Sequence, residues 1–228
     1  MFELRQNPWP ANAVHVVLDW ETMSTAHNAA PVQLAAVVAK PEGYVSFNQY
    51  INPKSSEAHG LHVDPETMKW WDRQDPALRA RVFGGTKSLI EVLISFMGYL
   101  HSLCFDYEKD EADWSRIFLW GNGVEFDVQI LRETYEKVLL PLGYDKFPIS
   151  FRNFDHVRTL YRCVPRSLLQ EVTDKFNTNY PEAKVHDAEA DAAYHAKLVA
   201  ACLHWLEVAQ ADYHHGMSSH HGNQEEHF

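Results

Sequence analysis

The feature that most constrains the fold is a continuous apolar, β-branched run near the start of the chain, from Ala13 to Trp20. A run that does not alternate between apolar and polar residues is typical of a strand buried on both faces. Such a strand needs a covering layer on each side of its sheet. The run therefore favours an α/β domain with a central sheet flanked by helices.

The rest of the chain supplies the other elements of such a domain. Further strands are predicted over 32–38, 44–51 and 116–120, and Pro41-Glu42-Gly43 is a turn signal that favours an antiparallel hairpin. Segment 106–113 is expected to be a solvated, charged loop. The order of elements indicates a mixed sheet. Helical periodicity is found over 65–81 with a break at Pro76, and over 86–105, 126–140, 167–176 and 188–211.

The length of 228 residues favours one large domain, predicted over 1–211, because domains average about 150 residues. The remaining segment, 212–228, is predicted to be a flexible tail. It is polar, and His214 to Phe228 carries five of the 14 histidines.

The charge of −11, from 20 basic and 31 acidic residues, argues against a protein that coats duplex nucleic acid through a broad basic surface. It does not exclude an enzyme that grips a short polyanion through metal ions. No apolar run reaches the roughly 20 residues of a membrane span, and the N-terminus lacks the apolar core of a signal peptide. A cytoplasmic protein without a membrane partner is expected. Its cysteines are predicted to be buried, reduced thiols: Cys104, Cys163 and Cys202.

Asp19-Trp20-Glu21 is one of four Asp-x-Glu sequences in the chain and the one that ends the buried strand. Since strand side chains alternate, Asp19 and Glu21 share a face, about 6–7 Å apart along the strand. Two carboxylates at the carboxyl end of a strand are suited to hold a hard cation. The alternative is two ordinary surface acids at a strand terminus.

Two further acidic motifs follow. Asp127 lies in the first turn of a helix, after the Gly-rich turn Trp120-Gly121-Asn122-Gly123, where it could simply complement the helix dipole. His186 and Asp191 lie at the start of the last helix. Positions five apart on a helix differ by about 140°, so a shared site requires His186 on a loop before the helix. The alternative for this pair is a capping acid and a surface histidine.

Taken together, these acids predict a cation site. Carboxylates in one cleft repel one another by several kcal/mol per close pair at an effective dielectric near 20. A cluster of four is tolerable only with cations between its members. The predicted members are Asp19, Glu21, Asp127 and Asp191.

The motifs occur in the order of the DEDDh 3′–5′ exonucleases, and the chain resembles that family from about Val14 to Val199. Within the family it is similar to ribonuclease T-like enzymes of the phage exonuclease A and mycobacterial exoribonuclease type. Asp64-Pro-Glu-Thr-Met-Lys-Trp70-Trp71 and Val157-Arg158-Thr159 carry that likeness. The branch usually has an Arg-Asp pair just ahead of its Val/Ile-Arg-Thr segment, where this chain has Asp155-His156. The resemblance implies a ribonuclease H-like fold.

The resemblance also implies a two-metal phosphodiester hydrolysis that releases 5′-mononucleotides from a 3′ end. Two divalent cations, Mg²⁺ or Mn²⁺, would lie about 3.5–4 Å apart. Asp19 would bridge them, Glu21 and Asp191 would complete the first site, and Asp127 would hold the second. His186 would accept the proton of the attacking water, a task suited to a side chain that titrates near neutral pH.

Several residues are candidates for substrate contact. Met23 could wedge against the terminal base and Phe126 could stack on a base, although both could equally be core residues. Trp70 and Trp71 face different directions on a helix, so at most one is expected to line the cleft. Arg158 and Arg162, four apart in a locally basic stretch, share a face if that segment is helical and are candidate phosphate contacts, with a solvated helix face as the alternative. The predicted contacts are Thr22, Met23, Asn122, Phe126 and Arg158.

The resulting hypothesis is a metal-dependent 3′–5′ exonuclease that acts on single-stranded nucleic acid with a free 3′ end. The phage-type likeness favours DNA over RNA. The alternatives are a 3′–5′ exoribonuclease, a hydrolase of short oligonucleotides, and an inactive nucleic-acid-binding module. Homodimerisation is compatible with each of these.

Overall fold

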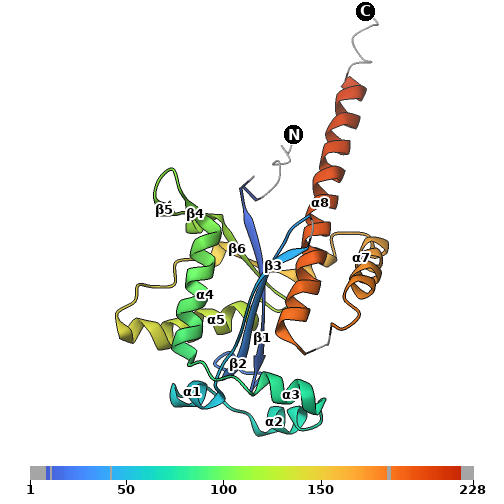
Figure 1. Ribbon diagram of the computed structural model, residues 1–228. Helices are drawn as coiled ribbons and strands as arrows, with labels where there is room; N and C mark the ends of the chain where they lie inside the picture. The colour runs from blue at the N-terminus through green and yellow to red at the C-terminus, as the bar shows by residue number, and fades with distance from the viewer. Residues whose placement is uncertain (1–8, 11, 42, 184–185, 222–228) are drawn as a thin grey trace, which may run out of the picture.

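The computed structural model describes residues 9–10, 12–41, 43–183 and 186–221, the last ten of them as backbone alone. Its centre is a five-stranded sheet of order β3-β2-β1-β6-β7 (Figure 1). β1 (Val14–Thr22), β2 (Pro31–Ala39) and β3 (Tyr44–Tyr50) are antiparallel neighbours. β6 (Ile117–Gly121) is parallel to β1 and to β7 (Phe154–His156). The predicted mixed sheet in an α/β fold is confirmed, and the arrangement is consistent with a ribonuclease H-like fold.

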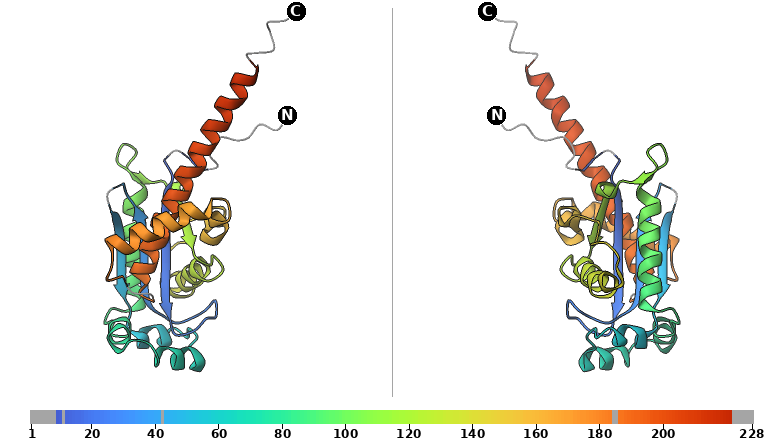
Figure 2. Two further views of the ribbon diagram at one scale, coloured as in Figure 1. Left: turned by 90° about the vertical axis from the view of Figure 1, so that its right-hand side faces the viewer. Right: turned by 90° about the vertical axis from the view of Figure 1, so that its left-hand side faces the viewer.

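Helices cover both faces of the sheet, as the buried first strand required. α4 (Leu89–Cys104) and α5 (Asp127–Leu139) pack on one face. α8 (Ala188–His221) packs on the other with α6 (Val157–Tyr161) and α7 (Arg166–Asn179) (Figure 2).

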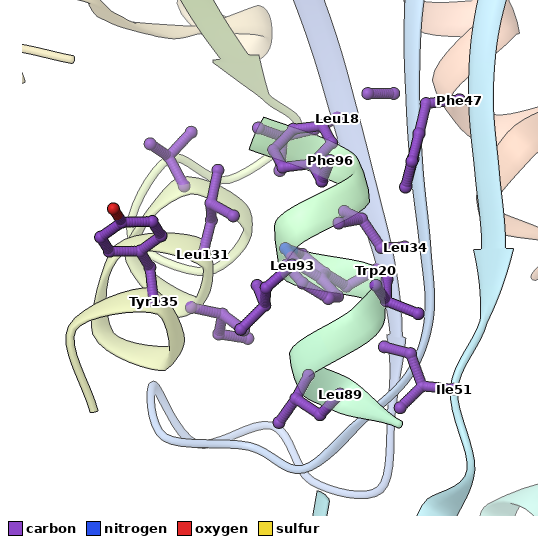
Figure 3. Packing of buried hydrophobic residues seen from close by; sticks show 14 of the residues in the cluster. Leu18, Trp20, Leu34, Phe47, Ile51, Leu89, Leu93, Phe96, Leu131 and Tyr135 are labelled. Carbon is purple, nitrogen blue, oxygen red and sulfur yellow. The ribbon is translucent and has the colours of Figure 1, made fainter. Parts of the chain in front are cut away.

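The core between the sheet and the α4 layer contains large apolar side chains from every adjoining element. Figure 3 shows Leu93 and Phe96 of α4 packed against Leu18 and Leu34 of the strands, with Leu131 of α5 beside them. Burying such side chains removes apolar surface from water at about 25 cal/mol per Å². This layer fixes β1 firmly at the middle of the sheet.

Alternation along β1 sends successive side chains to different layers. Val16, Leu18 and Trp20 belong to the core against α4 and α5, and Val17 belongs to the core against α8. By the same alternation, Asp19 and Glu21 face the side of the sheet that α8 covers. The strand therefore delivers its two acids to the layer that contains the start of α8.

Three short helices lie beyond the carboxyl end of β1 (Figure 1). They are α1 (Pro53–Ala58), α2 (Pro65–Trp71) and α3 (Pro76–Val82). Each begins with proline, and each is capped by the preceding side chain, which accepts backbone N–H groups of the first turn. The break that the sequence predicted at Pro76 separates α2 from α3.

The structure differs from the sequence-based expectations at several short elements. α1, β7 and α6 were not predicted, and the charged segment 106–113 contains part of a small hairpin of β4 (Phe105–Asp106) and β5 (Glu111–Ala112). Cys163 is exposed, against the expectation of a buried thiol, because it follows α6 on the outward side, while Cys104 and Cys202 are buried.

α8 continues to His221, ten residues beyond its predicted end at Ala211. The rest of the predicted tail, 222–228, lies outside the described residues. Among the described helices, none combines the length and the apolar character that a membrane span requires.

Candidate functional site

Four carboxylates from three elements meet at the carboxyl end of β1. Asp19 and Glu21 lie among the last four residues of β1, and Asp127 begins α5 after the turn that follows the neighbouring strand β6. Asp191 lies in the first turn of α8. Because β1 and β6 are parallel, their carboxyl ends lie at the same edge of the sheet, and this brings the acids together.

The charges of these acids act on one another. Burial raises the pKa of Asp19 well above its ordinary value, and Asp127, Glu21, Asp191 and Asp187 raise it further. Burial, with Asp191, Asp187 and Asp127, raises the pKa of Glu21 from 4.5 to about 8. Burial also raises the pKa of Asp191. The cluster therefore disfavours its own ionised state unless positive charge is supplied.

Asp127 is seated by the turn that precedes it. Its Oδ2 accepts the N–H of Gly123 at 3.1 Å, and its backbone carbonyl accepts the indole N–H of Trp20 at 3.0 Å. A Cβ at Gly121 would lie 2.9 Å from both Cβ and Oδ2 of Asp127, so only glycine allows this close approach. Burial raises the pKa of Asp127 to about 7, although backbone N–H groups and the charge of Arg158 lower it.

His186 precedes α8, as the spacing to Asp191 required. Its backbone has φ +64°, an uncommon conformation for a residue with a side chain, and its N–H donates to Asp191 Oδ2 at 3.0 Å. One ring atom of His186 and one carboxylate oxygen each of Glu21 and Asp191 lie within 4.8 Å of one another. The ring also meets Trp70 edge-on, with centroids 4.7 Å apart. The hydrogen bond to Asp191 and the ring contact with Trp70 keep the imidazole beside the carboxylates of Glu21 and Asp191.

A buried polar network, absent from the sequence-based prediction, fixes the start of α8. Asp187 is 8% exposed, forms an ion pair with Arg81 of α3, and accepts from the Gln33 amide at 3.3 Å. Gln33 Oε1 accepts the N–H of Ala188 at 3.4 Å, and Gln33 lies opposite Glu21 in the β1–β2 register. Arg81 and Asp187 are 106 residues apart, so no local pattern could have indicated their contact.

A cavity of about 470 Å³ adjoins the cluster and shares Glu21 with it. This size lies within the range of roughly 300–1,000 Å³ usual for sites that bind small organic groups. Aromatic rings dominate the apolar part of its wall, and α2 supplies one side. The lining residues are Trp20, Glu21, Thr22, Thr25, Asp64, Glu66, Thr67, Trp70, Trp71 and Phe126.

The cavity is lined by some of the predicted substrate contacts and not by others. Thr22 and Phe126 line it, while Met23 is 2% exposed and packs in the core. This core position is the alternative that the sequence left open for Met23, and its role as a wedge stays a prediction. Both Trp70 and Trp71 contribute to the wall, against the expectation of one at most. They pack edge-to-face at the end of a short helix that lies across the cavity.

Asn122 and Arg158 are not among the residues that line the cavity, and both act on Asp127: a backbone hydrogen bond from Asn122 and the charge of Arg158 lower its pKa. Arg158 Nε donates to Asn122 Oδ1 at 3.1 Å. The unusual Asp155-His156 pair lies on β7, where Asp155 accepts the Trp9 indole N–H at 3.1 Å. His156 lies 3.6 Å from Glu125, an exposed residue of the Asn122–Asp127 turn. The Asp155-His156 pair, which departs from the expected Arg-Asp pair, thus has contacts of its own in this structure: Asp155 with Trp9 and His156 with Glu125.

The raised pKa values predict how stability depends on pH when cations are removed by a chelator. Glu21 and Asp127 titrate in the folded chain at about 8 and about 7, above their ordinary values of 4.5 and 3.8. At a pH between the ordinary and the raised pKa values, the folded chain binds more protons than the unfolded chain. The free energy of unfolding therefore falls as pH rises from about 5 to about 8. Chemical denaturation across this range measures the slope. Glu21→Gln should flatten it and the exposed Glu57→Gln should not; a level wild-type profile contradicts the prediction.

A substitution at Gly121 tests how tightly the Asp127 side chain is packed against the preceding turn. Gly121→Ala should lower the free energy of unfolding by about 1–3 kcal/mol, because the new methyl group overlaps the Asp127 side chain. Gly123→Ala is the matched control, since its Cβ would meet Phe126 Cβ at an ordinary 3.8 Å. Denaturant unfolding compares the two. Equal stabilities would show that Asp127 has room to move.

Two comparisons with known proteins relate this chain to exonucleases. The model of the 3′–5′ exoribonuclease Rv2179c-like domain matches residues 14–203. The exodeoxyribonuclease of Enterobacteria phage T4 is 26% identical over 127 residues, which are 50% of this chain and 52% of the phage protein. The chain thus spans about half the length of this curated relative. Because the domain model extends from the first residue of β1 into the packed part of α8, the chain belongs to the Rv2179c-like 3′–5′ exoribonuclease domain family.

Proposed function

We propose that this chain is a cation-dependent exonuclease that removes nucleotides from the 3′ end of single-stranded nucleic acid. The observation that carries the proposal is the shared position of Glu21, which belongs both to the carboxylate cluster and to the wall of the 470 Å³ cavity. A nucleobase in the cavity places its phosphodiester beside the acids. Membership of a family described as 3′–5′ exoribonucleases, and likeness to a phage exodeoxyribonuclease, support this reaction class and its direction.

The donor set suits Mg²⁺ or Mn²⁺. Carboxylate oxygens are the ligands that hard cations prefer, and the acids Asp19, Glu21, Asp127 and Asp191 supply them. Bound divalent cations supply the charge that neutralises these acids and that polarises a phosphodiester and a water. The raised pKa values support this assignment, because they mark a cluster that otherwise has to take up protons.

His186 is the proposed general base. Its ring atom lies with the oxygens of Glu21 and Asp191, and a water held there is within reach of an imidazole nitrogen. The edge contact with Trp70 limits rotation of the ring, and the bond from its N–H to Asp191 ties the backbone to the acids. The imidazole accepts the proton of the water that attacks the phosphorus.

The cavity is the proposed site of the terminal nucleotide. Phe126 and Trp70 provide aromatic surfaces on which a base stacks, which tolerates every base. Asp64 adds negative charge to the same wall, because hydrogen bonds from Thr67 lower the pKa of its carboxyl. A 3′-phosphate on the terminal nucleotide would bring further negative charge beside it, so a free 3′-hydroxyl is the expected requirement.

The direct test uses matched DNA and RNA 20-mers with either a 3′-hydroxyl or a 3′-phosphate, and a circular single strand of DNA. With Mg²⁺ or Mn²⁺, the 3′-hydroxyl strands should release 5′-mononucleotides stepwise, and the 3′-phosphate should block attack. The DNA arm tests the preference expected from the sequence against the RNA named in the family description. Chromatography of early products gives the direction of cleavage. Rapid cutting of the circle would overturn the exonuclease proposal, because a circle has no end.

Two variants separate cation binding from proton transfer. Asp19→Asn should abolish both turnover and the rise in melting temperature that Mn²⁺ produces, since that rise follows from binding to the folded state. His186→Ala should reduce kcat by roughly 10²–10⁴-fold and keep the Mn²⁺-dependent rise.

Thermal unfolding with and without Mn²⁺ is compared with kcat for each protein, with the exposed Glu57→Gln as control. Loss of the Mn²⁺-dependent rise in His186→Ala would make His186 a ligand rather than the base. Wild-type kcat in that variant would remove it from the mechanism.

A further inference from the structure

The strongly acidic chain has one compact group of arginines that the proposed chemistry leaves unexplained. Segment 152–166 contains four arginines and a single carboxylate, Asp155, giving a local charge of 4 − 1 = +3 against −11 for the whole chain. Asp155 is itself half-buried and accepts a hydrogen bond from Trp9. The positive charge is therefore not neutralised within the segment. The arginines are Arg152, Arg158, Arg162 and Arg166.

α6 turns these charges outward. Val157 and Leu160 are 0% and 6% exposed and pack in the core beneath α8, whereas Arg158 and Arg162 are exposed. Arg162 continues the helical geometry of α6, since its N–H donates to the carbonyl of Thr159. Residues four apart on a helix share a face and lie about 6 Å apart along the axis. The two guanidinium groups therefore follow one another along the surface.

The arginines of α6 and α7 have no carboxylate partner among the residues that the structure describes, because no salt bridge within 4.0 Å there involves Arg158, Arg162 or Arg166. Six of the eight ion pairs between described residues use a lysine or an arginine from another segment. An outward row of unpaired guanidinium groups suits phosphate groups, which accept from the planar fork of arginine.

The row begins at the carboxylate cluster. Arg158 contacts Asn122 in the turn that seats Asp127, and its charge reaches Asp127. It follows β7, at the sheet edge two strands from β1, whereas the cavity lies at the end of β1 with α2 as its wall. The cavity thus lies at the end of β1, whereas the arginines follow β7, two strands away in the sheet.

We propose that the outward face of α6, formed by Arg158 and Arg162 and extended by Arg166 at the start of α7, binds the phosphates upstream of the 3′-terminal nucleotide. This inference rests on the proposed function and adds the path of the substrate. The terminal base occupies the cavity, the scissile phosphodiester lies at the acids, and the preceding nucleotides run along the arginine row. The row makes affinity depend on the length of the strand.

The test uses Arg162→Gln, Arg166→Gln and the double variant, with Lys146→Gln as a control that removes one exposed cation elsewhere. KM is measured for a ladder of single-stranded oligonucleotides from two to twenty nucleotides. In wild type KM should fall severalfold as the strand lengthens, and in the double variant this fall should be lost. The slope of log KM against log salt for the 20-mer should decrease by about 0.7 for each phosphate contact removed. Melting temperatures check that the variants fold.

The outcomes separate the two proposals. If the double variant keeps the length dependence and salt slope of Lys146→Gln, the arginine row is an ordinary solvated face and the path is wrong, while the exonuclease proposal stands. If the wild-type protein degrades no oligonucleotide of any length with Mg²⁺ or Mn²⁺, both proposals fail.

Discussion

Mutual repulsion among buried carboxylates at the ends of β1 and β6 is the constraint that the rest of this structure has to meet. The acids raise one another's pKa values, and burial raises them further. Left to itself, such a cluster would spread apart. The architecture instead places it where the sheet is most rigid, on a central strand that is packed on both faces.

Hydrogen bonds between distant segments hold the surrounding backbone against this repulsion. The Trp20 indole binds the carbonyl of Asp127, and the Trp71 indole binds the carbonyl of Thr22. On the third side, Asp187 is held by Arg81 and by a buried strand glutamine. Each bond satisfies a polar group that would otherwise be buried alone, so these contacts both position the acids and avoid a desolvation penalty.

The sequence predicted those parts of the fold and site that depend on local periodicity. Alternation along one strand placed Asp19 and Glu21 on a common face, and a five-residue spacing placed His186 before the last helix. Elements of three to five residues, such as β7 and α6, carry too little periodicity to be predicted. The core position of Met23 and the contact of Arg81 with the start of α8 depend on tertiary packing, which no single segment encodes.

The length of α8 has a mechanical consequence for the site. One continuous helix carries Asp191 in its first turn and then extends past the body of the protein (Figure 1). Its 34 residues span about 51 Å at 1.5 Å per residue. The packed part of α8 runs from Ala188 to Leu206 and carries Asp191 at its start. The position of this carboxylate therefore depends on how the whole packed length of the helix lies against the sheet.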